Sequence, residues 1–363
     1  MTRPRKHTDF LGTLLAAQRL AFAPFIFKAA AAALSTGLLA RIDAKPGLSA
    51  EAHAAALGIS EYAAVVMTDI LHTAGIIEKN EAGGFLPTEV AELILFDDMT
   101  RANFFFADRV NYAGLEKTLD SLIEGRPAGL AHFGKDWQTI YPHLTALPED
   151  AQQAWFAFDH FHSDRAYEAA IAALRQLPQA ADPAAPLVLA DIGGNTGRFT
   201  RAFLAAFPNA RAVFVDLPEQ CATLAEREGM ADIMDRVRAA PIDWLTDRPL
   251  VGTEDADLYW MSQFLDCFSL EEARSILERT RAAMKPGARL LVLEPLVDEQ
   301  RHQAAALSLA ATSLYFTVLA NGNSRFFHGA ELRQLFEDSG FQIESEHPNL
   351  GISHTLFVLA QKE

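Results

Sequence analysis

The stretch 187–201 constrains the fold of this chain more than any other part of the sequence. It opens with an apolar run, 187–190, which is typical of a buried parallel strand. Asp191 and a glycine-rich turn from Gly193 to Gly197 follow, and apolar residues then recur at helical spacing. The order is therefore strand, glycine loop and helix, which can present backbone N–H groups to a ligand at the start of the helix.

A second predicted strand, 211–215, ends in Asp216, which lies 23 residues after Gly193. A carboxylate at this place can bind both hydroxyls of a ribose. The loop lacks the G-x-G-x-x-G pattern, which disfavours a dinucleotide, and it lacks the G-K-[S/T] sequence of a P-loop. A glycine loop alone could be only a tight turn, but the loop together with Asp216 predicts a nucleoside site.

The C-terminal half of the chain alternates between strand and helix patterns, which predicts a parallel sheet with helices on both faces. The short link 348–353 makes the last two strands antiparallel neighbours. Ligands of such a sheet bind at the carboxyl ends of its strands. The expected strands are 187–191, 212–216, 237–242, 257–263, 289–294, 341–346 and 355–359.

The first 110 residues read as helices followed by a hairpin around the turn 80–83, which is the pattern of a winged helix. The expected recognition helix, 60–74, contains no Lys or Arg. A helix that reads a DNA groove needs basic or amide side chains, so DNA binding is disfavoured. The formal net charge of −16 likewise disfavours nucleic acid and anionic membranes. The other helices expected here are 24–40 and 49–57.

The apolar segment 14–40 is interrupted by Gln18, Arg19, Pro24 and Lys28, so we do not expect it to span a membrane. It is too apolar for a solvated arm and should pack against a partner subunit. The chain has two cysteines, which exclude a disulfide framework and indicate a reducing compartment, with the cytoplasm as the expected location.

The middle region, 111–180, should be mostly helical, with helices at 112–124 and 155–174. In the second helix one face carries aromatic and basic side chains at positions i, i+3, i+4 and i+7. The face could be packed in the core, or it could form the wall of a substrate pocket. Its residues are Phe158, Phe161, His162 and Arg165.

The glycine loop resembles the D-x-G-G-G-x-G motif of S-adenosylmethionine-dependent methyltransferases, with Asn195 in place of the third glycine of the loop. Asn tolerates a positive φ better than most residues. Nearly the whole chain resembles the small-molecule O-methyltransferases of plant phenolic and bacterial polyketide-tailoring type. The resemblance implies an α/β fold with a seven-stranded, Rossmann-like class I methyltransferase sheet. It assigns 1–110 to a winged-helix dimerisation domain, 111–180 to a helical connector with pocket helices, and 181–363 to the cofactor-binding domain.

The resemblance also implies S-adenosylmethionine as the cofactor, S-adenosylhomocysteine as the product, a homodimer, and a small aromatic substrate. It places the methionine part of the cofactor beside Gly193, the ribose on Asp216 and the adenine near Asp243. The implied cofactor residues are Asp191, Gly193, Gly194, Asn195, Gly197, Asp216, Leu217, Asp243, Trp244 and Ser262. Phe158, Phe161, His162, Arg165 and Gln263 would line the substrate pocket.

The expected catalytic residues are Asp266, Glu294 and His328, and here the sequence departs from the family. The family reads H-D-W after the fourth strand, with the His as general base, whereas this chain has Asp266 at that position. Glu294 matches the acid that orients the base, and His328 lies in the segment that normally supplies a second acid. A metal site built from these three residues is disfavoured, because they lack a ligand spacing motif.

A free Asp has a pKa of about 3.9 and a phenol one of about 10, so an ordinary Asp is a poor base for a phenol. Burial or a second carboxylate would raise its pKa. Three hypotheses remain open. Asp266 or His328 is the base for O-methylation; the substrate is already acidic or is methylated at an activated carbon; or methyl transfer is lost, as in cofactor-binding relatives of decarboxylase or hydroxylase type. We expect both carboxyls to face the open space beside the cofactor sulfur, with His328 opposite.

Overall fold

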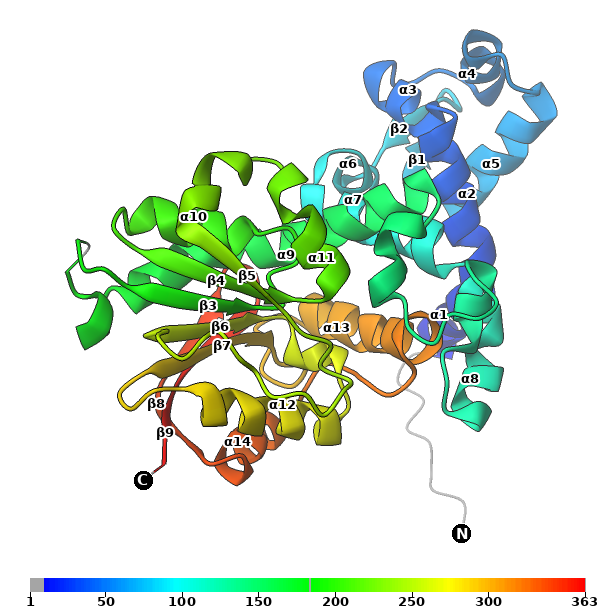
Figure 1. Ribbon diagram of the computed structural model, residues 1–363. Coiled ribbons are helices and arrows are strands. Elements are labelled where there is room, and N and C mark those ends of the chain that lie inside the picture. Colours follow the sequence, from blue (N-terminus) through cyan, green and yellow to red (C-terminus); the bar gives the residue numbers. More distant parts are fainter. Residues whose placement is uncertain (1–9, 183, 363) are drawn as a thin grey trace. The chain divides into compact units, whose positions relative to one another are not determined.

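The computed structural model describes residues 10–182 and 184–362. The chain divides into two compact units, Met1–Asp108 and Arg109–Glu363. The first unit holds helices and one small hairpin, and the second holds the large sheet with its covering helices (Figure 1).

The first unit packs its helices around a core that includes Leu38, Ile42 and Leu71. Strands β1 (Ile77–Lys79) and β2 (Phe85–Pro87) pair antiparallel, so the expected hairpin is present. Its helices are α1 (Phe10–Ala21), α2 (Ala23–Ser35), α3 (Leu38–Ala44), α4 (Ala50–Leu57), α5 (Glu61–Thr73), α6 (Glu89–Phe96) and α7 (Asp98–Phe105).

One helix of the first unit differs from its prediction. The segment 24–40 is two helices, because α2 ends at Ser35 and Gly37 adopts a left-handed φ of 77° before α3 begins. Glycine takes this conformation without steric cost, which allows the break. The starts of α4 and α5 are as predicted: Ser49 and Ser60 each accept a backbone N–H at 3.4 Å, which caps the helix.

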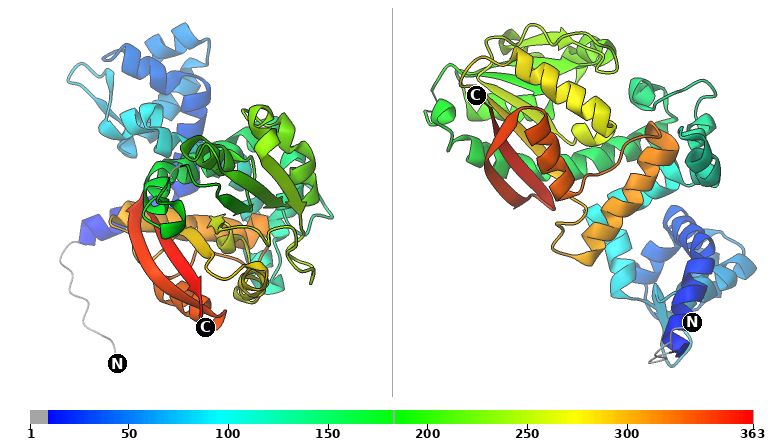
Figure 2. Two further views of the ribbon diagram at one scale, coloured as in Figure 1. Left: turned by 60° about the vertical axis from the view of Figure 1, so that its left-hand side comes forward. Right: turned by 90° about the horizontal axis from the view of Figure 1, so that it is seen from below.

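The second unit contains one seven-stranded sheet in the order β5-β4-β3-β6-β7-β9-β8. The first five strands in this order run parallel, β9 runs antiparallel to β7, and β8 pairs antiparallel with β9. Figure 2 shows this last pair as a long hairpin at one edge. All seven predicted strands are confirmed: β3 (Val188–Ile192), β4 (Arg211–Asp216), β5 (Val237–Pro241), β6 (Leu258–Ser262), β7 (Arg289–Pro295), β8 (Phe341–Leu350) and β9 (His354–Gln361).

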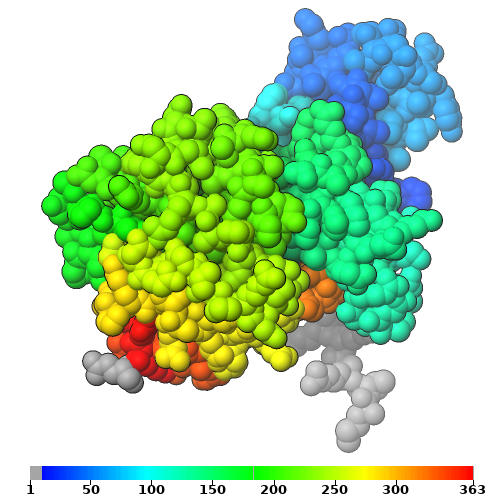
Figure 3. Space-filling view, viewed as in Figure 1, coloured from blue at the N-terminus to red at the C-terminus, as the bar shows by residue number. Residues whose placement is uncertain are grey.

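Alternate side chains of the strands enter two cores, one on each face of the sheet. Ala190 and Val213 join the core under α12 (Leu270–Ala283) and α14 (Gly329–Asp338). Their neighbours Leu189 and Ala212 join the core under α9 (Glu149–Leu174) and α10 (Arg198–Ala206). Figure 3 shows how green and yellow segments, which include the α12 region, form the outer layer on one side. The predicted layering of helices on both faces is therefore confirmed.

The connector helices differ in length from their predictions. Helix α8 (Thr118–Glu124) starts after a separate 3-10 turn at Gly114–Lys117, so 112–124 is not one helix. Helix α9 begins at Glu149, rather than at residue 155. The remaining helices are α11 (Pro218–Thr223) and α13 (Gln303–Tyr315).

Within residues 10–182 and 184–362, Gln303–Ala320 is the one single helical stretch whose length and apolar composition would allow it to cross a membrane. It contains α13 and the short π-helical continuation Phe316–Ala320. Only 28% of this stretch is buried within the protein. The bent pair α1 and α2 would count as a second stretch only if the two helices formed one span. A single apolar helix of this kind also occurs in the cores of soluble proteins, so it does not identify a membrane protein.

Candidate functional site

The glycine loop lies at the carboxyl end of β3 and is closely packed. Gly193 has a φ of 72°, and its N–H donates to the carbonyl of Val215 at 2.8 Å. A Cβ on Gly193 would lie 2.2 Å from Cδ2 of Phe264, and one on Gly194 would lie 2.4 Å from Cε2 of Phe214. Both positions therefore require glycine. Gly197, with a φ of 76°, begins helix α10.

Asp216 ends β4 beside this loop, as the sequence predicts. Its Oδ2 accepts the N–H of Asn195 at 2.8 Å, and its Oδ1 accepts the N–H of Leu217 at 2.7 Å. Burial raises the pKa of Asp216 to about 6, although these hydrogen bonds act against the shift. A carboxylate oxygen can accept two hydrogen bonds, so both oxygens keep capacity for ribose hydroxyls. Asn195 has a φ of 51°, the conformation expected of it.

Asp191 is a buried residue of β3 that supports the glycine loop. It is 1% exposed and accepts the hydroxyl hydrogen of Thr200 at 2.5 Å. Burial raises its pKa to about 7. A direct contact between Asp191 and the cofactor stays a prediction, and the buried carboxyl offers almost no surface for it. Its hydrogen bond instead fixes the start of α10 below the glycine loop.

Two polar groups near the ends of β5 and β6 are candidates for contact with a ligand. The indole Nε1 of Trp244 and the Oγ of Ser262 are buried and have no hydrogen-bond partner within the described part of the chain. Arg279 lies over the Trp244 ring, 4.9 Å from its centroid, and Phe264 packs against the same ring edge-on. Asp243 accepts the N–H of Leu245 at 3.0 Å. Buried groups without partners are costly, so a bound molecule would relieve them.

Asp266 and Glu294 form a buried pair of carboxyls. They are 2% and 0% exposed, on the 3-10 turn Leu265–Cys267 and on β7. Glu294 Oε1 accepts the N–H groups of Phe264 and Leu265 at 3.1 and 2.9 Å, which fixes the segment that carries Asp266. The prediction that both carboxyls face open space is wrong, because the protein encloses them.

The environment of this pair changes its acid–base behaviour. Burial raises the pKa of Asp266 to about 7. Burial and the neighbouring charge of Asp266 raise the pKa of Glu294 well above its usual range. Two adjacent carboxyls resist ionising together. The pair therefore holds a proton to higher pH than an isolated carboxyl does.

His328 lies apart from this pair in the contacts that the structure describes. Its side chain is 54% exposed, and its Nδ1 lies 3.5 Å from Oδ2 of Asp298 at the beginning of α14. Asp298 also accepts the N–H of Gly329 at 2.9 Å, so both residues belong to the helix start. This surface pairing corrects the expectation that His328 faces the two carboxyls across the site.

The predicted pocket wall is an aromatic cluster on α9. The rings of Phe158 and His162 lie 4.7 Å apart, and the guanidinium of Arg165 lies 4.2 Å from the centre of the Phe161 ring. Burial lowers the pKa of His162 to about 4, so it is neutral at physiological pH. Gln263 has a φ of 47°, and its Oε1 is 2.6 Å from Nε2 of His354. The role of these residues as a substrate pocket stays a prediction.

Three residues of α9 that the sequence did not single out contact the glycine loop or the first residue of α10. Oδ2 of Asp159 accepts from Nδ2 of Asn195 at 3.0 Å. The loop also receives a contact between His160 Nε2 and Thr196 Oγ1 at 3.2 Å, and Arg198 forms an ion pair with Asp164. The one signal available was Asn195 itself, whose side chain at a usual glycine position needs a partner.

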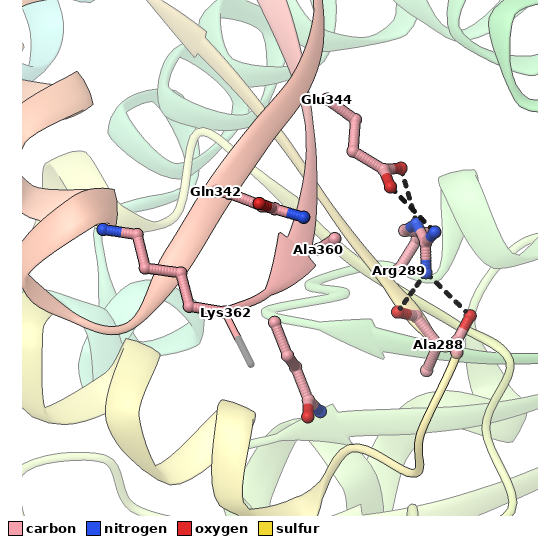
Figure 4. Close-up of a pocket in the computed structure, with 8 residues that line it drawn as sticks. Ala288, Arg289, Gln342, Glu344, Ala360 and Lys362 are labelled. Carbon is pink, nitrogen blue, oxygen red and sulfur yellow. Dashed lines mark hydrogen bonds and ion pairs between the residues drawn. The ribbon is translucent and has the colours of Figure 1, made fainter.

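A polar hollow lies elsewhere on the sheet (Figure 4). It surrounds Arg289, whose guanidinium binds both oxygens of Glu344 at 2.5 and 2.8 Å. Arg289 is the first residue of β7, so the hollow lies at the amino ends of the parallel strands. The glycine loop follows the carboxyl end of β3, and the hollow is therefore not part of the candidate site.

Comparison with known proteins assigns the domain. Residues 167–342 match the O-methyltransferase domain family. A 3-amino-4-hydroxybenzoate 4-O-methyltransferase from Streptomyces cremeus is 28% identical over 281 residues, covering 76% of this chain and 70% of the relative. An L-tyrosine C(3)-methyltransferase from Streptomyces lavendulae is 22% identical over 316 residues, covering 86% and 83%.

A solved structure has the same fold. It is an O-methyltransferase from neocarzinostatin biosynthesis in complex with S-adenosyl-L-homocysteine and 1,4-dihydroxy-2-naphthoic acid. It superposes with a TM-score of 0.67 at 20% identity and covers 92% of this chain and 95% of its own. The predicted class I architecture is therefore confirmed.

Proposed function

Since this chain belongs to the family of S-adenosylmethionine-dependent small-molecule O-methyltransferases, we propose that it methylates a hydroxyl group of a small aromatic or polyketide-like molecule. The observation that carries the proposal is the position of Asp216. It closes the glycine loop at the carboxyl end of β4, with both oxygens able to accept further hydrogen bonds.

The chain's own residues fit the cofactor. Asp216 would hold the ribose, and the partnerless groups of Trp244 and Ser262 lie on the side where the adenine would bind. Gly193 and Gly194 leave room for close approach of the ligand to the loop. When bound, the cofactor supplies an already activated methyl group. The remaining task of the protein is to align the substrate oxygen with that group and to exclude water.

Asp266 is the proposed general base. Burial raises the pKa of Asp266 to about 7, which is about three units below the pKa of a phenol, whereas the pKa of an ordinary Asp is about six units below it. The smaller difference makes Asp266 a usable proton acceptor. Glu294 would act as a positioning residue, because it binds the two N–H groups that precede Asp266. Since both groups are enclosed, the proposal requires the substrate to enter against this segment.

Phenols that carry a carboxylate are the proposed substrate class. The Streptomyces cremeus relative acts on 3-amino-4-hydroxybenzoate, and the structural neighbour holds a dihydroxynaphthoic acid. On α9 the exposed cation Arg165 lies over the Phe161 ring, which would suit an aromatic acid. The test is to incubate the protein with such phenols and to measure S-adenosylhomocysteine formation and the product by mass spectrometry.

C-methylation is the second candidate. It is favoured by the likeness to an L-tyrosine C(3)-methyltransferase over most of the chain, and by Asp266 in the usual His position. A substrate carbon activated by a neighbouring phenol needs a weaker base than a hydroxyl does. Nuclear magnetic resonance of the product separates the two, because an O-methyl and a C-methyl group differ clearly in chemical shift.

Replacing Asp216 with Ala should weaken S-adenosylhomocysteine binding by about 1.5–3 kcal/mol, the usual contribution of hydrogen bonds to a charged group. Isothermal titration calorimetry measures the affinity. Asp232→Ala, at an exposed position of the same unit, is the control and should bind like the wild type. Unchanged affinity of the Asp216 variant would remove the ribose assignment.

We also propose that the first unit is a winged-helix dimerisation domain. Helix α1 has no buried residue, and its Leu20 is 78% exposed, so its apolar side chains are not covered by the residues that the structure describes. The protein should be a dimer by light scattering at micromolar concentration, and Leu20→Asp should shift it toward monomer. Val251→Asp, at another exposed apolar residue, should leave the dimer intact. A monomeric wild type would contradict the proposal.

A further inference from the structure

Helix α9 holds the glycine loop and the start of α10 by three side-chain contacts. Its residues Asp159, His160 and Asp164 contact Asn195, Thr196 and Arg198. Two of these contacts join groups that suit each other: Arg198 forms an ion pair with Asp164, and the Thr196 hydroxyl contacts a ring nitrogen of His160. The third leaves a carboxylate with one neutral amide donor, and this is the contact that calls for a further partner.

The surroundings of Asp159 contain more negative than positive charge. Its carboxyl faces Asp164 on its own helix and Asp266 on the 3-10 turn after β6, and both raise its pKa. Asn195 donates to it, and Arg198 lowers its pKa from a distance while it pairs with Asp164. Burial is the largest cause, and together these effects raise the pKa of Asp159 to about 7. A cation that reached this carboxyl would be stabilised.

Asp159 is also accessible, unlike Asp191 and Asp266. Its surface is partly exposed although protein surrounds its carboxyl closely, and the same is true of Asp216. Such a combination is expected for residues that line a recess. Asn195 connects the two acids, because its backbone N–H donates to Asp216 and its side-chain amide donates to Asp159. The two carboxylates therefore stand at either side of one loop residue.

The order of the strands indicates which part of the cofactor meets Asp159. Asp216 is the last residue of β4, and Asp243 and Trp244 follow β5, the outer neighbour of β4. A ribose held by Asp216 and an adenine near Asp243 would occupy the β4 and β5 side of the loop. The amino-acid end of S-adenosylmethionine would then extend the other way, over β3 and toward α9, whose Asp159 contacts Asn195. That end carries an α-ammonium group, which is a cation with three donors.

We propose that Asp159 binds the α-ammonium group of S-adenosylmethionine, with Asn195 holding the carboxylate in place. This inference rests on the proposed function. The positively charged ammonium would donate a charge-assisted hydrogen bond to the Asp159 carboxylate and would offset its negative charge. It makes Asp159 a cofactor-binding residue on the same helix as the proposed substrate wall.

A thermodynamic cycle tests the inference in the full-length protein by calorimetry. The two ligands are S-adenosylhomocysteine and its analogue in which hydrogen replaces the amino group. The two proteins are wild type and Asp159→Asn, which keeps the shape of the side chain. The wild type should bind the analogue about 10- to 100-fold more weakly, and the variant should bind S-adenosylhomocysteine more weakly by a similar factor. The variant should distinguish the two ligands by less than about twofold.

Glu168→Gln is the matched control, because it removes a carboxylate from an exposed position of the same helix. It should retain most of the discrimination between the two ligands. If the variant at Asp159 discriminates as strongly as wild type, Asp159 shapes the loop only, and the inference is overturned. If Asp159→Asn does not fold, the wild type can still overturn the inference, which fails when loss of the amino group weakens binding by less than about tenfold. Failure of wild type to bind S-adenosylhomocysteine would overturn the proposed function as well.

Discussion

Replacing Asp266 with Asn should lower the rate of methyl transfer by about 10²–10⁴-fold, the usual size of general-base catalysis. Asn keeps the shape of the side chain, including its place beside Glu294, but cannot accept the proton. The rate is followed by S-adenosylhomocysteine formation with carboxylated phenols such as 3-amino-4-hydroxybenzoate. Affinity for S-adenosylhomocysteine should change by less than about twofold. A loss of rate under about tenfold would mean that alignment alone drives the reaction.

The pH profile gives the same test in the wild type. A base acts when it is deprotonated, so kcat/KM should rise with pH and level off above about 7, the raised pKa of Asp266. This rising limb should disappear in Asp266→Asn. His328→Ala is the matched comparison, because a His base would also titrate in this range. We expect that variant to keep both the limb and the rate, since His328 pairs with Asp298 at the surface.

Replacing Gly193 with Ala should lower the free energy of unfolding by about 2–5 kcal/mol. The positive φ of 72° costs an L-residue about 1–2 kcal/mol, and overpacking adds about 1–3 kcal/mol. The new methyl would meet the ring of Phe264, which is itself held between Trp244 and Phe268. Denaturant unfolding measures the change.

Gly287→Ala is the control for this prediction. Gly287 has a φ of 83°, but a Cβ there meets nothing within 4 Å. It should therefore lose only the conformational part, about 1–2 kcal/mol. Equal losses in the two variants would show that Phe264 yields to the methyl group, and the close packing of the loop on Phe264 would then not explain the need for glycine.

Local patterns in the sequence were sufficient to predict the strands and the loop. The strand before Gly193, the glycine turn and the carboxylate of Asp216 lie within 30 residues of one another. Each of them has a local sequence pattern, so each could be predicted. The break at Gly37 was missed because the alanine-rich run before it and the leucines after it both favour helix, and only the backbone conformation shows where the first helix stops.

Contacts between distant segments could not be read from the sequence. Asp159 and Asn195 are 36 positions apart and meet only when α9 packs beside the loop. The burial of Asp266 and the exposure of His328 depend on how β6, β7 and α14 are connected in space. The family motifs identified the candidate catalytic residues, whereas tertiary packing determines which of them are buried.

Helix α9 has a consequence for attempts to change the specificity of this enzyme. Phe158, His162 and Arg165 lie along one side of the helix, while Asp159 and His160 face the loop from other sides. On the proposed assignment, a library that varies the first group would explore new substrates on an unchanged cofactor site. Variation of the second group would change substrate binding and cofactor binding together, because each such mutant would also carry an altered glycine loop. The same separation would apply in evolution, because single substitutions on the first side of α9 would change the substrate and leave the cofactor site in place.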